Sequence, residues 1–257
     1  MEARGLDILM LLENSYMPVG RRQNWPPLAG LIDPLIWLID PSVALAGAAA
    51  VTERLLLGTK VRLMTHQDPI NTAKAVASQD LMSKGRVILG VAGGALDTDM
   101  QKPRCEFRKR WEITCERTLA VRQFWAEELA EFHGEFVDFG PLSSWPKPLQ
   151  AGGPPVWIGS NSKSVPDRVA EYADGWIVFR GLYKGDAPAD MRAACDAAGR
   201  DFSELTLTLM NAPREEAELR GFIAAGFRKF IYMLPAAGDP VSQELDGIAA
   251  LAERLRA

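Results

Sequence analysis

Residues 154–176, PPVWIGSNSKSVPDRVAEYADGW, contain the pattern that decides the fold class. A short apolar strand ends at Gly159, and a helical spacing of apolar residues resumes after Ser160, Asn161 and Ser162. A strand that is apolar on both faces and leads directly into a helix is typical of a parallel α/β sheet. The glycine permits close approach to the backbone, and the free N–H groups at the start of a helix suit an anion such as phosphate. Serine and asparagine are also common helix caps, so the stretch alone fits either a phosphate site or a plain cap.

The same alternation of strand and helix continues along the chain. Apolar runs predict seven strands, over residues 6–12, 55–63, 86–94, 156–158, 176–179, 205–210 and 230–234. Helical spacing predicts further helices over residues 41–54, 69–85, 106–128, 187–200 and 214–226. Asp40 and Pro41 are suited to start the first of these helices, and Gly85 is suited to end the second. Strands joined through helices run parallel, so we expect an α/β fold, a single TIM-type (β/α) barrel domain over residues 1–257.

The number of strands leaves the closure of this barrel open. A closed (β/α) barrel has one β/α unit more than the sequence predicts. Residues 2–7, EARGLD, resemble the end of a helix that leads into the first strand. An open parallel edge leaves backbone groups unpaired. Either the first β/α unit is absent from this chain, or the barrel is closed by other means, such as dimerisation.

Composition narrows the class of partner to a small molecule. The chain has 257 residues, 47% of them hydrophobic, and its net charge of −4 results from 29 basic and 33 acidic residues. Scattered basic residues argue against nucleic-acid binding, which requires clustered Lys and Arg. The apolar run at residues 43–51 is too short to span a membrane, and we recognise no signal peptide. The two histidines lack the spacing of a zinc site, so we expect no metal. The three cysteines lack a C-x-x-C spacing, which favours reduced thiols and therefore the cytoplasm.

Several longer segments resemble one enzyme family. They are DPSVALAGAAAVTERLLLGTKV (40–61), DPINTAKAVASQDLMSKGRVILGVAGG (68–94), FHGEFVDF with SWPKPLQ (132–150), PPVWIGSNS (154–162) and YADGWI (172–177). In this order and spacing they are similar to the luciferase-like monooxygenase family, specifically its branch of coenzyme F-420-dependent oxidoreductases. The resemblance implies a TIM-type barrel that binds a deazaflavin, coenzyme F-420, with FMN as the alternative, and it implies a homodimer.

The resemblance also implies which residues bind the cofactor. The phosphate is expected at Gly159, Ser160, Asn161 and Ser162. Contacts with the ring are expected at the ends of the earlier strands, from Glu13, Asn14, Met64, Thr65, Gly93 and Gly94. A non-proline cis peptide is expected near Met64 and Thr65. The anionic tail of F-420 favours nearby cations, and those available are Arg62, Lys163 and Arg168.

Two departures from the family pattern bear on catalysis. After the first strand, the family usually has an acid followed by His. This chain has Glu13 and Asn14 after the strand at residues 6–12, and asparagine cannot act as a general acid or base. Residues 95–97, Ala-Leu-Asp, replace polar residues that follow a later strand in the family. His66 is then the best remaining candidate for proton transfer, although a histidine in a loop often serves only as a hydrogen-bonding group.

Three functions stay open at this point. The first, which we favour because the phosphate motif and the strand-end glycines are present, is an oxidoreductase that transfers a hydride between F-420 and an unidentified organic substrate. The second uses the same scaffold with FMN and oxygen as a monooxygenase. The third is a barrel that has lost catalysis and acts as a binding or structural protein, which the replaced residues would explain.

Overall fold

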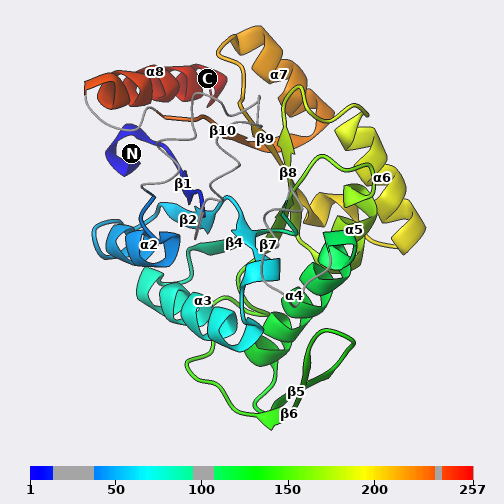
Figure 1. Ribbon diagram of the computed structural model, residues 1–257. Helices are drawn as coiled ribbons and strands as arrows, with labels where there is room; N and C mark the ends of the chain where they lie inside the picture. The colour runs from blue at the N-terminus through cyan, green and yellow to red at the C-terminus, as the bar shows by residue number, and fades with distance from the viewer. Residues whose placement is uncertain (14–37, 95–106, 235–238, 257) are drawn as a thin grey trace, which may run out of the picture. The chain divides into compact units, whose positions relative to one another are not determined.

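The computed structural model describes residues 1–13, 38–94, 107–234 and 239–256 (Figure 1). The predicted ring contact Asn14 and the replaced residues 95–97 lie outside these ranges. The chain divides into two compact parts, residues 9–154 and residues 1–8 with 155–257. Each part is described by itself, and the single domain over residues 1–257 stays a prediction.

The part formed by residues 9–154 is built on parallel strands. Its strands are β1 (Ile8–Leu11), β2 (Leu56–Thr59), β3 (Arg62–Leu63) and β4 (Val87–Ala92). The order is β1-β2-β4, and β3 also pairs with β4 in parallel. The helices are α2 (Pro41–Ala50), α3 (Pro69–Ser83) and α4 (Arg110–Ala126), with short 3-10 turns η4 (Met64–His66) and η6 (Phe107–Lys109). These three helices pack against one another in chain order and against β2 and β4 (Figure 1).

The helices α2 and α3 begin where the sequence predicts, and their caps show why, whereas α4 begins at Arg110, after the predicted start at residue 106. The Asp40 carboxylate accepts the backbone N–H groups of Ser42 and Val43, at 2.8 and 3.3 Å, directly before α2. Asp68 accepts the N–H of Asn71 at 2.8 Å before α3. In both helices proline is the first residue, where its missing N–H costs nothing.

The predicted strand 55–63 is two strands separated by a bulge. β2 pairs with β4 through Gly58 and Ile88, but β3 pairs with β4 only from Arg62 onward. The Thr59 hydroxyl donates to the Gly90 carbonyl at 2.8 Å and accepts the Gly90 N–H at 3.1 Å, so it bonds both backbone groups of that residue. The non-proline cis peptide lies in this bulge, between Lys60 and Val61, and the expectation that placed it near Met64 and Thr65 is wrong.

Gly90 is required by this bulge, and its replacement provides a stability test. A Cβ at residue 90 would lie 2.0 Å from the Thr59 carbonyl oxygen, whereas a Cβ at Gly47 in α2 would meet nothing within 4 Å. We expect Gly90→Ala to lower the free energy of unfolding by about 3 kcal/mol through overpacking. Gly47→Ala is the matched control, expected to stabilise α2 by up to ~1 kcal/mol. Urea unfolding measures both, and equal stability of the two variants would contradict the assignment.

The sequence did not predict the hairpin at residues 130–142. β5 (Ala130–His133) and β6 (Asp138–Leu142) pair antiparallel after α4. The Glu116 carboxylate of α4 accepts the backbone N–H groups of Phe136 and Val137, at 2.7 and 3.0 Å. The hairpin turn is therefore fixed by a helix residue far away in sequence.

The segment SWPKPLQ is held by two buried or half-buried contacts. Asp80 of α3 is fully buried and accepts the backbone N–H groups of Leu149 and Gln150, at 2.8 and 3.0 Å. The Lys147 ammonium donates to the carbonyl of Phe124 at 2.7 Å, near the end of α4. The Lys147 contact gives that lysine a structural role, and the Asp80 contacts hold the backbone of the segment against α3.

The second part continues the alternation of strand and helix. Its elements are η1 (Glu2–Arg4), β7 (Val156–Gly159), α5 (Val165–Tyr172), β8 (Gly175–Phe179), α6 (Ala187–Ala198), η7 (Phe202–Glu204), β9 (Thr206–Met210), α7 (Glu216–Ala225), β10 (Phe227–Ile231) and α8 (Asp239–Arg256). β7, β8, β9 and β10 pair in parallel in this order (Figure 1). Side chains that are almost fully buried, including Trp176, Ile177 and Leu207, form the core at these strands.

One strand in this part starts earlier than the sequence analysis predicts, and one helix was not predicted. The strand predicted over 230–234 occupies Phe227–Ile231, because α7 ends at Ala225, its cap Gly226 has a positive φ of 119°, and the strand follows at once. The exposed Arg228 in that strand concealed its start, and α8 was not predicted. Among the described helices, none combines the length and the apolar character needed to cross a membrane.

Candidate functional site

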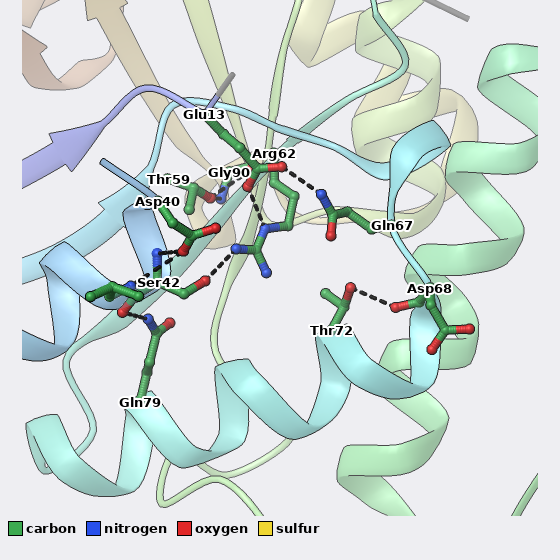
Figure 2. Close-up of polar contacts among 11 residues, drawn as sticks. Glu13, Asp40, Ser42, Thr59, Arg62, Gln67, Asp68, Thr72, Gln79 and Gly90 are labelled. Carbon is green, nitrogen blue, oxygen red and sulfur yellow. Dashed lines mark hydrogen bonds and ion pairs between the residues drawn. The ribbon is translucent and has the colours of Figure 1, made fainter. Parts of the chain in front are cut away.

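A buried ion pair lies where β1 and β3 end (Figure 2). Arg62 Nε and Glu13 Oε2 are 2.7 Å apart, and each side chain is only 5% exposed. The other carboxylate oxygen of Glu13 accepts a hydrogen bond from the Gln67 amide at 2.6 Å. The Arg62 guanidinium also donates to the Ser42 hydroxyl at 2.5 Å. The predicted ring contact Glu13 is therefore held by Arg62 of β3 and by Gln67, which directly follows η4.

The electrostatics of this pair explain why it must stay complete. Burial raises the pKa of Glu13, and the neighbouring Arg62 charge opposes that rise. Removing either partner would leave an uncompensated charge in a buried place, which typically costs about 3–5 kcal/mol. The charge of the Arg62 guanidinium is balanced by Glu13, and the group also bonds Ser42, so we do not assign Arg62 to an anionic cofactor tail.

The turn η4 presents the three predicted residues Met64, Thr65 and His66. Met64 is fully buried, and its carbonyl accepts a hydrogen bond from Arg117 at 2.7 Å. Thr65 is 5% exposed, and its buried hydroxyl oxygen has no hydrogen-bond partner in the part of the chain that the structure describes. A buried hydroxyl without a partner costs about 1–3 kcal/mol, so this group fits a site that a ligand completes. His66 is half-buried at the end of the same turn.

The glycines after β4 have a structural reason of their own. A Cβ at Gly93 would lie 3.2 Å from the Arg110 carbonyl oxygen and 3.2 Å from the Thr114 hydroxyl, both in α4. Gly94 has a φ of 88°, which L side chains rarely adopt. Close packing of α4 thus explains Gly93, whereas the sequence analysis attributed it to approach of a cofactor ring.

Lys60 is a residue of this region that the sequence analysis missed. It follows β2, is 3% exposed, and its backbone N–H donates to the Leu11 carbonyl at 2.7 Å. Burial lowers the pKa of Lys60 from 10.5 to about 8. The signal in the sequence was a lysine inside the apolar run LLLGTKVRL, where a charged residue is seldom found without a reason.

This lowered pKa predicts a pH-dependent stability. The unfolded chain binds a proton at Lys60 more tightly than the folded chain, so stability rises with pH between about 8 and 10.5 and is lowest below that window. A shift of this size corresponds to about 3 kcal/mol. We expect Lys60→Met to raise the free energy of unfolding at pH 7 by up to ~3 kcal/mol and to flatten that rise.

Urea unfolding from pH 7 to 10.5 measures this effect. The exposed residue Lys84, changed to Met, serves as the control and should keep the pH slope of the unchanged protein. The same slope in Lys60→Met as in the unchanged protein would show that burial does not govern this lysine.

In the second part, the predicted phosphate loop follows β7 directly. Gly159 is the last residue of β7, but α5 begins only at Val165, with Ser164 as its cap, later than the sequence pattern indicates. The Asn161 side-chain oxygen accepts the Phe179 N–H at 3.1 Å. The Trp176 indole donates to the Ser160 carbonyl at 2.8 Å. The loop is therefore fixed against β8.

Within this loop the serines differ in exposure. Ser160 is half-buried and Ser162 is exposed, and the Ser162 N–H approaches the Ser160 hydroxyl at 3.4 Å. The Ser162 and Ser164 hydroxyls are 3.0 Å apart, and Arg168 donates to Ser164. The loop thus has an exposed hydroxyl and nearby positive charge, a donor set that suits an anion.

Comparison with known proteins identifies the family. The model of the luciferase-like monooxygenase family matches residues 1–218, and the chain belongs to this family. An uncharacterized protein of Mycobacterium tuberculosis is 31% identical over 260 residues, which cover 100% of this chain and 90% of that protein. An F-420-dependent glucose-6-phosphate dehydrogenase of Kineococcus radiotolerans is 27% identical over 215 residues, covering 81% of this chain and 59% of that enzyme.

A solved structure agrees with the predicted fold. An F-420-dependent secondary alcohol dehydrogenase, in complex with an F-420-acetone adduct, is similar with a TM-score of 0.78 at 13% identity. The similarity covers 100% of this chain and 92% of that chain. The predicted α/β fold of the TIM-barrel type and the predicted family are therefore confirmed.

Proposed function

We propose that this protein is an oxidoreductase that binds coenzyme F-420 and acts on a small organic molecule. The observation that carries the proposal is the buried Thr65 hydroxyl without a described partner, in a family whose relatives include F-420-dependent dehydrogenases. When bound, the deazaflavin supplies or accepts a hydride.

The residues are assigned as the sequence analysis predicts. Gly159, Ser160, Asn161 and Ser162 bind the phosphate, and the fixed shape of their loop supports this role. Ring contacts are assigned to Met64 and Thr65 and, in addition, to Glu13, Asn14, Gly93 and Gly94. Among the residues that the structure describes, each carboxylate oxygen of Glu13 accepts one hydrogen bond, from Arg62 or Gln67, and a carboxylate oxygen can accept two.

The transfer of a proton to or from the substrate is assigned to His66. A substrate that gains or loses a hydride at an oxygen-bearing carbon must also exchange a proton at that oxygen. A neutral imidazole accepts such a proton and its protonated form donates one near neutral pH. His66 follows Thr65 in the same turn, which supports this role. The cytoplasm, where F-420 would be available and Cys115 and Cys195 would stay reduced, is part of the proposal.

A second candidate is an FMN-dependent monooxygenase on the same scaffold. The family name, luciferase-like monooxygenase, is the finding that favours it. FMN also has a phosphate, so the loop at residues 159–162 suits both cofactors. A catalytically inactive barrel is the third outcome, in which neither cofactor binds.

Cofactor titration distinguishes these functions. We expect the purified protein to bind F-420 more tightly than FMN, as measured by the change in cofactor fluorescence. Ser162→Asp places a negative charge in the phosphate loop and is expected to weaken binding about tenfold. Ser143→Asp, at another exposed serine, is the matched control and should bind normally.

The outcomes have separate meanings. Binding of FMN alone would favour the monooxygenase. Folded protein that binds neither cofactor would contradict the oxidoreductase proposal.

We also propose that two copies of the chain associate through α2 and α3. These packed helices leave large apolar side chains exposed, including Val43 (67%), Val51 (82%) and Met82 (57%). Exposed apolar patches of this kind mark interaction surfaces, and a second copy of the same chain is the simplest partner.

A single charge tests this association. Val43→Glu is expected to convert a dimer into a monomer in light scattering after size exclusion, without loss of helix content. Leu129→Glu, at a 63% exposed leucine outside α2 and α3, is the control and should leave the dimer intact. An unchanged mass for Val43→Glu, or a monomeric unchanged protein, would contradict the proposal.

A further inference from the structure

The carbonyl of Ser160, in the predicted phosphate loop, is bonded by a side chain of the next strand. The Trp176 indole N–H donates to this carbonyl at 2.8 Å. Trp176 is the second residue of β8 and is 0% exposed. Its ring packs edge-on against Tyr183, with ring centroids 4.8 Å apart, and the Tyr183 hydroxyl donates to Asp190 at 2.6 Å. The donor to the loop is therefore held in one position by the packing around β8.

This bond determines the direction of the peptide that follows. The Ser160 carbonyl and the Asn161 N–H belong to one peptide unit, and in a trans peptide these two groups point in opposite directions. The cis peptides of the described chain lie elsewhere, after Lys60 and after Trp145. Because the carbonyl points at Trp176, the Asn161 N–H points away from it. In the part of the chain that the structure describes, this N–H has no hydrogen-bond partner.

The Asn161 side chain is used in another way. Its oxygen accepts the Phe179 N–H at 3.1 Å, which holds the loop against the end of β8. What Asn161 keeps for an anion are its donors, and a backbone N–H is a suitable donor to a phosphate oxygen. The direction of that N–H is the one that the Trp176 bond imposes.

We propose that Trp176 is a positioning residue for the cofactor phosphate: by bonding the Ser160 carbonyl, it directs the Asn161 N–H to the phosphate. The proposal rests on the function proposed above and adds a residue that acts through the loop, without touching the cofactor. Without the indole N–H the peptide can rotate, and its carbonyl oxygen, which repels a phosphate, can replace the N–H. A ligand that has no phosphate loses nothing by this rotation.

The test compares F-420 with the deazaflavin alcohol that has the same ring and ribityl chain but no phosphate. Trp176→Phe removes the indole N–H and keeps an aromatic ring at this position. We expect this variant to bind F-420 about tenfold more weakly in a fluorescence titration, because one charge-assisted hydrogen bond is lost. Its affinity for the alcohol should equal that of the unchanged protein.

Trp157→Phe is the matched control. Trp157 is 3% exposed, and it pairs in register with Gly175, where a Cβ would lie 2.6 Å from the indole. Because successive residues of a strand face opposite sides of the sheet, Trp157 and Trp176 lie on opposite faces. The control makes the same change to a buried tryptophan that does not bond the loop, so it should keep the ratio of the two affinities.

A measurement on the unchanged protein does not depend on the folding of a variant. In protein with isotope-labelled asparagine, the amide proton of Asn161 should shift downfield in the NMR spectrum when F-420 binds. Binding of the alcohol should leave this signal in place, because the alcohol brings no phosphate to the N–H.

The outcomes separate this proposal from the proposed function. An equal loss of affinity for both ligands in Trp176→Phe, or an Asn161 amide signal that F-420 does not shift, would overturn the role of Trp176 and leave the proposed oxidoreductase in place. Failure of both ligands to bind the folded, unchanged protein would overturn the proposal together with the proposed function.

Discussion

The buried ion pair between Glu13 and Arg62 is the constraint on which residues 9–154 depend. Two charges removed from water are tolerated only if their remaining hydrogen-bonding capacity is used. Here Gln67 and Ser42 supply those hydrogen bonds, and Gln79 of α3 in turn donates to the Ser42 carbonyl at 2.6 Å (Figure 2). One pair thus connects the end of β1, the strand β3 and the starts of two helices, and it fixes the position of the turn at Met64, Thr65 and His66.

Local chemistry made much of the fold predictable. Asp40 and Pro41 identified the start of α2, because the aspartate side chain accepts backbone N–H groups that the helix itself leaves unpaired and proline has no N–H to leave unpaired. The features that sequence reasoning missed depend on distant residues. The hairpin at residues 130–142 is held by Glu116, and the break in the strand near Thr59 depends on Gly90 of a neighbouring strand.

The candidate site was less predictable, for the same reason. Arg62 seemed available to a cofactor on sequence alone, but a sequence does not reveal that its charge is used by Glu13. Lys60 was missed because an apolar run indicates a buried strand but does not show that a lysine within the run is buried as well. The loop at residues 159–162 keeps its predicted place after a strand, and the contacts of Asn161 with Phe179 give it a fixed shape that residue types could not show.

The most direct test of the account is amide hydrogen exchange of the folded protein with and without F-420. The account predicts slower exchange on F-420 binding at the backbone amides of residues 160–165 and 64–66, with little change in the hairpin at residues 130–142. Binding that leaves both of the first two segments unprotected would contradict the assignment of the cofactor to these residues.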